Sequence, residues 1–100
     1  MSSGNGEPRQ YSVSMSQAQR AKLMQLLHEQ DAKGGGERFY RAYRQIIRRL
    51  ERDPRIFGER LYTLPAVRLE IRTAAIAPLV VDYGVHEEKK FVFIQGFKVM

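Results

Sequence analysis

The chain has 100 residues, of which 43% are hydrophobic and 28% are charged, and its formal charge is +6. This length allows one modest core, so we predict a single domain over residues 11–100, after a polar, Gly/Ser-rich flexible tail over residues 1–10. Without cysteine there can be no disulfide and no thiolate zinc site, and His28 and His86 lack the spacing of metal ligands. We therefore expect no metal and no cofactor.

The charge and the hydropathy pattern narrow the class of partner. The positive charge favours an anionic partner: a nucleic acid, an acidic protein segment or a phospholipid surface. Charge alone does not choose among these. No uninterrupted apolar stretch approaches a membrane span or the core of a signal peptide, so we expect a cytoplasmic protein without a membrane partner.

The first elements in the chain are a short strand and a helix. Apolar residues and serines alternate over residues 11–15, which predicts a strand with one solvent-exposed face. Ser16 precedes Gln19 by three positions, as in a capping box, so the hydroxyl and the amide can both bond open donors at a helix start. The helix should run from Gln17 to Lys33, and the glycines at 34–36 should end it.

A second helix is predicted from Glu37 to Arg52, and Pro54 should end it because proline disfavours helical geometry at the residue before it. Its apolar face, at spacings of three and four, consists of Phe39, Tyr43, Ile46, Ile47 and Leu50. The opposite face offers candidate partner-binding residues, which are Arg41, Arg44, Arg48 and Arg52. These arginines could bind phosphate or acidic side chains, or could form a solvated face with their stems packed along the apolar rim, and the second interpretation is favoured.

Three apolar runs follow the helices and predict three consecutive antiparallel strands. The runs are Leu61–Leu64 with Val67–Ile76, then Leu79–Val85, then Phe91–Val99. The predicted fold is α+β, with the strand at 11–15 and the helical hairpin packed on one face of an antiparallel sheet.

One face of the first run is the candidate site. Arg68, Glu70 and Arg72 alternate with apolar residues, so we expect them to project from the sheet face opposite the helices. They could form a phosphate-binding site with a general base, or simply a ladder of solvated charges, in which exposed ion pairs contribute only ~0–1 kcal/mol.

The register of the last hairpin decides where Lys98 points. If Val85 pairs with Phe91, the phenylalanines join the core and Lys98 shares the face of Arg68 and Arg72. If Val85 pairs with Val92 instead, Lys98 turns away. The sequence leaves both registers open.

Other polar and aromatic residues have simpler interpretations. Tyr83 shares the period of its apolar neighbours and is expected in the core. His86 should be a solvated residue at the start of a polar turn, although it could shuttle a proton near neutral pH. His28 is expected on a helix surface, and Phe57 and Tyr62 are expected to pack beside the connection from helix to strand.

Several short stretches stand out along the predicted order of strand, helical hairpin and three antiparallel strands. They are Asp53-Pro54 through Gly58-Glu59-Arg60-Leu61, Val67-Arg68-Leu69, Tyr83-Gly84-Val85, and Val92-Phe93-Ile94 ending in Phe97-Lys98. Together with the order of elements, these stretches resemble the RelE/ParE toxin superfamily of bacterial toxin–antitoxin modules. The resemblance as a whole covers roughly Tyr11 to Lys98 and consists mostly of hydrophobic patterns. The resemblance implies that Arg68 and Lys98 match basic residues which the family often has in its second and last strands.

The resemblance also implies a function. In the ribonuclease branch the sheet face holds ribosome-bound messenger RNA and cleaves it without metal, which requires cations where charge develops and a group that exchanges a proton. On this reading the catalytic candidates are Arg68, Glu70, Arg72 and Lys98, and the RNA-binding ones are Arg68, Arg72 and Lys98. Val80 stands where the family often has an arginine, and the sequence ends at Met100 without the further aromatic or basic group of some active members.

The expectation is therefore a toxin-like protein that acts on translation by binding ribosome-associated messenger RNA, with weak or absent metal-independent endoribonuclease activity. The alternative is a non-catalytic, ParE-like protein-interaction module, either gyrase-targeting or a domesticated toxin. For a true toxin the resemblance implies a cognate antitoxin as partner, whereas an interaction module need not have one.

Overall fold

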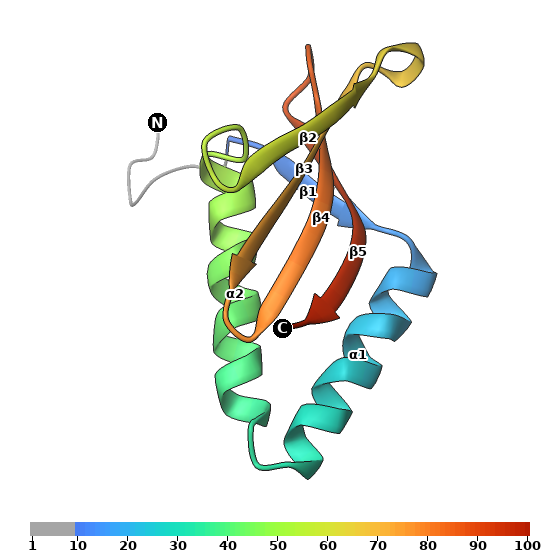
Figure 1. The fold of residues 1–100 in the computed structure, drawn as a ribbon. Coiled ribbons are helices and arrows are strands. Elements are labelled where there is room, and N and C mark those ends of the chain that lie inside the picture. The colour runs from blue at the N-terminus through green and yellow to red at the C-terminus, as the bar shows by residue number, and fades with distance from the viewer. Residues whose placement is uncertain (1–9) are drawn as a thin grey trace, which may run out of the picture.

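A five-stranded sheet with two helices against one face forms the part of the chain that the computed structural model describes, residues 10–100 (Figure 1). The elements in chain order are β1 (Ser12–Met15), α1 (Gln17–Ala32), α2 (Gly36–Arg52), β2 (Glu59–Leu64), a 3₁₀ turn (Pro65–Val67), β3 (Leu69–Ile76), β4 (Leu79–His86) and β5 (Phe91–Val99). The predicted α+β class is confirmed. Residues 1–9 of the predicted tail lie outside the described residues, and the Gln10 amide donates to the Glu51 carbonyl at 3.1 Å.

Both helices begin and end within one residue of the predicted bounds, because local signals set them. The Ser16 hydroxyl accepts from the Gln19 amide at 3.2 Å. The reciprocal half of the capping box is not formed, since among the described residues the Gln19 side-chain oxygen has no hydrogen-bond partner. Gly34 ends α1 with a φ of 84°, a left-handed conformation that glycine adopts without strain.

The sheet is mixed rather than antiparallel, which corrects the prediction. Its strand order is β1-β5-β4-β3-β2, and β1 runs parallel to β5 while every other pair is antiparallel. Alternation of side chains predicts a strand but carries no information on its partner or direction. The helical hairpin lies between β1 and the other strands in the sequence. In the sheet, β1 pairs with β5 and forms the edge opposite β2.

The core lies between the helices and one face of the sheet. From the helices, Phe39, Ile46 and Leu50 are each at most 1% exposed. The sheet contributes fully buried side chains from its central strand β4 and the adjacent β5, which are Leu79, Val81, Tyr83, Val85, Val92 and Ile94. Tyr83 is therefore a core residue, as predicted. Neither α1 nor α2 nor any other helix of residues 10–100 covers the other face of the sheet, which is called the open face below (Figure 1).

The first predicted strand is in fact two strands. Pro65 begins a 3₁₀ turn, Arg68 follows it with a φ of 56°, and the chain reverses so that Leu64 pairs with Leu69. Proline cannot donate to a strand ladder, which makes a break at this point favourable. The sequence did not reveal this turn, because apolar residues both precede and follow it.

The hairpin between β4 and β5 adopts the second of the two predicted registers. Val85 pairs with Val92, so Phe91 and Phe93 point to the open face. A bulge then inserts Gln95 between Ile94, which pairs with Tyr83, and Gly96. Because a bulge shifts the alternation by one residue, Phe97 returns to the core and Lys98 points to the open face.

Candidate functional site

Arg72, the centre of the predicted site, is buried under the loop that follows α2. It pairs with Tyr83 across the sheet, which places it on the helix side, and it is only 7% exposed. Its guanidinium donates to the carbonyls of Phe57 at 3.4 Å and Gly58 at 3.1 Å, and to the Glu70 carboxylate at 3.3 Å. The predicted projection of Arg72 from the face opposite the helices is therefore wrong.

The reason for this error lies on the open face. The apolar residues that alternate with Arg72 were expected to face the helices, but Ile71 pairs with Gly84 and Leu69 with His86, on the open side. There the Ile71 and Leu69 side chains lie against the position that a Cβ of Gly84 would take. Apolar partners on both faces of β3 make the direction of alternation ambiguous.

Glu70 shares the helix side with Arg72 and is held by cations. Its Oε2 accepts from Arg72 and lies 3.9 Å from the Nε of Arg60. Its side chain is 15% exposed. This carboxylate is well placed to fix the side chain of Arg72, because one of its oxygens already accepts a hydrogen bond from the Arg72 guanidinium.

Arg68 lies apart from the other predicted residues, at the tip of the β2–β3 hairpin. Its side chain is exposed and forms an ion pair with Glu88 on the β4–β5 turn. Its carbonyl accepts from the Glu87 amide at 2.9 Å. It neither belongs to a strand nor continues a charge ladder with Glu70.

Lys98 lies at the other end of the sheet. It pairs with Val80, whereas Arg68 follows the 3₁₀ turn beside the end of β4 at His86. Six strand positions separate Val80 from His86, which is about 20 Å at 3.3 Å per residue. The structure therefore brings Glu70 and Arg72 together on the helix side of the sheet and places Arg68 and Lys98 at opposite ends of the sheet.

The buried polar side chains hold the loop Asp53–Gly58, which connects α2 to β2. The Tyr83 hydroxyl lies between the carbonyls of Pro54, at 2.8 Å, and Phe57. Arg49 donates to the Asp53 carboxylate at 2.9 and 3.3 Å, and its guanidinium lies 4.6 Å from the centre of the Phe57 ring. We call this loop with Arg49, Arg72 and Tyr83 the loop anchor.

The environment of Tyr83 is reflected in its pKa. Burial raises the pKa of the Tyr83 hydroxyl above its ordinary value of 10.0, and the neighbouring Arg72 partly offsets the rise.

Phe57, which stacks on the Tyr83 ring, is packed as predicted, whereas Tyr62 is 52% exposed and is not the packing residue that was predicted.

The predicted surroundings are confirmed for His28, whereas His86 is half-buried at the end of β4 and not the solvated residue that was expected. His28 is exposed on α1. His86 begins the β4–β5 turn, where its Nδ1 accepts from the amides of Glu88 and Lys89, both at 3.1 Å. These bonds shape the turn and place His86 in a structural role.

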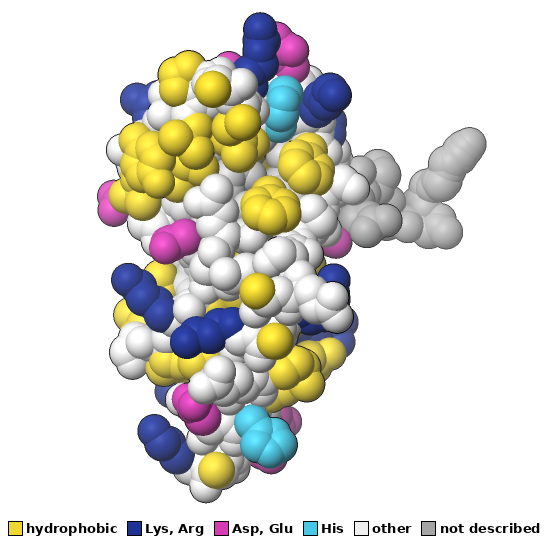
Figure 2. Space-filling view, turned by 90° about the vertical axis from the view of Figure 1, so that its right-hand side faces the viewer, with side chains coloured by type: hydrophobic (Ala, Val, Ile, Leu, Met, Phe, Trp, Pro, Cys, Tyr) yellow, Lys and Arg dark blue, Asp and Glu magenta, His cyan; other side chains and the backbone are white. Residues whose placement is uncertain are grey.

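The open face carries an apolar patch that the sequence did not reveal. A row of paired residues crosses the sheet from Tyr62 through Ile71 and Gly84 to Phe93. Hydrophobic side chains gather toward the two hairpin turns, in the upper part of Figure 2. We define the apolar patch by hydrophobic residues that are half-exposed or exposed. On the strands of the open face these are Tyr62, Leu64, Leu69, Phe91 and Phe93, and next to them in the chain are Leu61 at the bulge of β2 and Val67 in the 3₁₀ turn. The sequence does contain apolar residues on both sides of Pro65. They indicate a shared surface only once the structure shows that the chain reverses at Pro65 and pairs β2 with β3.

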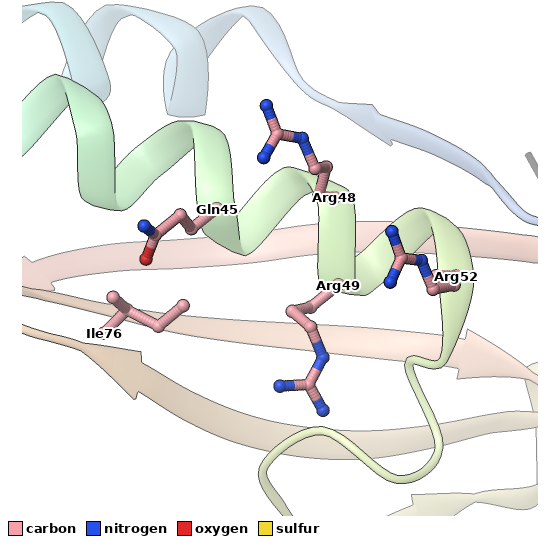
Figure 3. A pocket seen from close by; sticks show the side chains of 5 residues that line it. All are labelled: Gln45, Arg48, Arg49, Arg52 and Ile76. Carbon is pink, nitrogen blue, oxygen red and sulfur yellow. The ribbon is translucent and has the colours of Figure 1, made fainter. Parts of the chain in front are cut away.

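The predicted partner-binding arginines share one surface. Arg41, Arg44, Arg48 and Arg52 are all exposed along the outer side of α2. Their neighbour Arg49 turns toward the sheet and belongs to the loop anchor (Figure 3).

Comparisons with protein-family models, curated proteins and solved structures found no match for this chain. Within residues 10–100, no helix has both the length and the apolar character required to cross a membrane. In the same part of the chain, no three His, Asp or Glu side chains gather as metal ligands.

Proposed function

We propose that the protein is a non-catalytic interaction module of the RelE/ParE type, which binds a protein target in the cytoplasm through the apolar patch on the open face of its sheet. The observation that carries this proposal is the patch itself. Leu61, Tyr62 and Val67 are each more than half exposed, and Leu64 is 38% exposed. Contiguous apolar surface of this kind is typical of protein–protein contact sites.

The arrangement of the predicted catalytic residues supports binding rather than cleavage. Hydrolysis of RNA without metal needs cations and a proton-exchanging group around one phosphate. Arg72 donates to two backbone carbonyls and to Glu70, and Arg68 and Lys98 lie at opposite ends of the sheet. No single phosphate could contact all of these groups at once.

The order of elements supports the RelE/ParE part of the proposal. A strand, a helical hairpin and antiparallel strands follow one another along the chain, as the resemblance implies, and both helices cover the same face of the sheet. A toxin of this type would be encoded beside a small acidic or mixed-charge antitoxin.

The test is inducible expression of the protein alone, with growth as the readout, followed by two assays. Messenger RNA ends are mapped in a translating extract that contains a chelator, and supercoiling by purified gyrase is measured with added protein. We expect growth arrest without codon-position-specific cleavage, and loss of the arrest in Tyr62→Ser/Leu64→Ser. The control is Met24→Ser, which removes an equally exposed apolar side chain from α1.

Rapid cleavage that is lost in Arg68→Ala would contradict the proposal, and so would arrest that survives the Tyr62/Leu64 double substitution. Supercoiling separates the targets: inhibition identifies gyrase, and its absence points to another protein. Binding of ribosome-associated messenger RNA remains a second candidate function, because the arginines of α2 form an exposed basic surface.

A further inference from the structure

The outer side of α2 is hollowed where its arginines lie. One hollow of about 340 Å³ is lined by Glu37, Tyr40, Arg41, Arg44, Gln45 and Arg48. A second of about 270 Å³ is lined by Gln45, Arg48, Arg49, Arg52 and Ile76 (Figure 3). Because Gln45 and Arg48 line both, the two hollows form one continuous track along the helix.

Most of the cations on this track are available to a ligand. Within residues 10–100, Arg48 has no ion pair or hydrogen bond, and in Figure 3 it points away from the sheet. Arg41 contacts Glu37 at 3.3 Å, but both side chains are largely exposed, so this pair contributes little and can exchange for a phosphate. Arg44 lies 5.9 Å from the centre of the Tyr40 ring and makes no ion pair among the described residues.

The track also presents an aromatic ring. Tyr40 is 50% exposed and lines the first hollow between the arginines. Its ring centre lies 6.4 Å from that of Tyr43, which packs against the core. A half-exposed ring of this kind can stack on a nucleobase once the exposed Arg44 side chain turns from the ring to a phosphate.

We propose that this track binds single-stranded nucleic acid, with Arg44, Arg48 and Arg52 on successive phosphates and Tyr40 stacked on a base. The guanidinium matches phosphate geometry with paired hydrogen bonds. Residues four apart on a helix advance by about 6 Å, so the arginines repeat at a regular spacing that suits a polymer with evenly spaced charges. A cationic groove beside an aromatic side chain is the usual design of such sites.

Two other anionic partners fit the track less well. Insertion into a lipid surface needs several exposed apolar side chains, and the only large exposed hydrophobic residue described on α2 is Tyr40. An acidic protein segment could bind the arginines, but it would make only general packing contacts with the exposed ring of Tyr40 between them. The site lies on a helix, away from the open face of the sheet, so it does not rest on the proposed protein-binding function.

The test is fluorescence anisotropy with the full chain and a labelled 12-nucleotide single-stranded RNA, at several salt concentrations. The same sequence as single-stranded DNA and as duplex RNA separates the kinds of nucleic acid. We expect Arg44→Ala/Arg48→Ala to weaken binding about tenfold or more at 0.1 M salt and to reduce the slope of log K against log salt by about 1.4. The charge-matched control is Lys22→Ala/Lys33→Ala, which removes two exposed cations at and beside α1 and should leave most of the affinity.

The stacking contact has its own variants. We expect Tyr40→Ala to weaken binding at least about fivefold while Tyr40→Phe retains it, because stacking needs only the ring. Equal losses in the α2 variant and its control would overturn the proposal, since binding would then follow net charge alone. Tighter binding to polyglutamate, or to vesicles of phosphatidylcholine and phosphatidylserine at 3:1, than to any of the oligonucleotides would overturn it as well. Retention of the fold in each variant is checked by circular dichroism.

Discussion

The loop anchor and the outer side of α2 use the same residue type in opposite ways. In the loop anchor, Arg72 is 7% exposed and its guanidinium donates to two carbonyls and a carboxylate. On α2, Arg48 is exposed and has no such partner among the described residues. The comparison teaches that the acceptors which the tertiary structure brings around an arginine decide whether it stabilises the fold or binds a partner.

The largest effect is expected at the centre of the loop anchor. Arg72→Ala would leave the Phe57 and Gly58 carbonyls without this donor and the partly buried Glu70 without its closest cation. We expect a loss of about 2–4 kcal/mol in the free energy of unfolding, measured by urea denaturation. An Arg72 exposed on the face opposite the helices, as the sequence led us to expect, would instead contribute only ~0–1 kcal/mol.

Glu70→Gln is the matched control for this substitution, because it keeps an oxygen acceptor for Arg72 and removes only the charge. It should cost less than Arg72→Ala. A change below about 0.5 kcal/mol in Arg72→Ala would show that the loop Asp53–Gly58 does not depend on this arginine.

A smaller effect is expected from Tyr83→Phe, which removes the hydroxyl between the Pro54 and Phe57 carbonyls but keeps the ring. We expect a loss of about 1–2 kcal/mol at neutral pH.

The pH dependence gives a second readout of the same variant. Because burial raises the pKa of Tyr83 in the folded state above 10.0, its contribution is complete below pH 10 and is lost as the pH rises from there through the folded-state value. The stability of the wild type should therefore fall above pH 10, and more steeply than that of Tyr83→Phe. Tyr43, whose pKa burial also raises, remains in both proteins. If the free energy of unfolding fell equally steeply above pH 10 in the wild type and in Tyr83→Phe, this pH dependence could not be assigned to Tyr83.

The smallest effect on stability is expected on α2. Arg48→Ala removes an exposed side chain without ion pairs among the described residues, and alanine is the better helix former. The free energy of unfolding should change by no more than about 0.5 kcal/mol. A larger loss by urea denaturation would mean that Arg48 stabilises the fold, and the contrast with Arg72 would then disappear.

The sequence alone determined the helices and their core face. Ser16, the glycines at 34–36 and Pro54 act within a few residues of the helix ends, and the spacing of Phe39, Ile46 and Leu50 depends only on the helical period. It also determined that Tyr83 is buried and that the α2 arginines share an exposed side.

Only the tertiary structure decided the candidate site. The face of Arg72 depends on which strand pairs with β3 and in which register, and the position of Lys98 depends on a bulge at Gln95. The apolar patch required the hairpin at Pro65 to bring β2 beside β3. Each of these is a pairing between residues distant in sequence, and alternation in one strand is equally compatible with either face when both faces carry apolar partners.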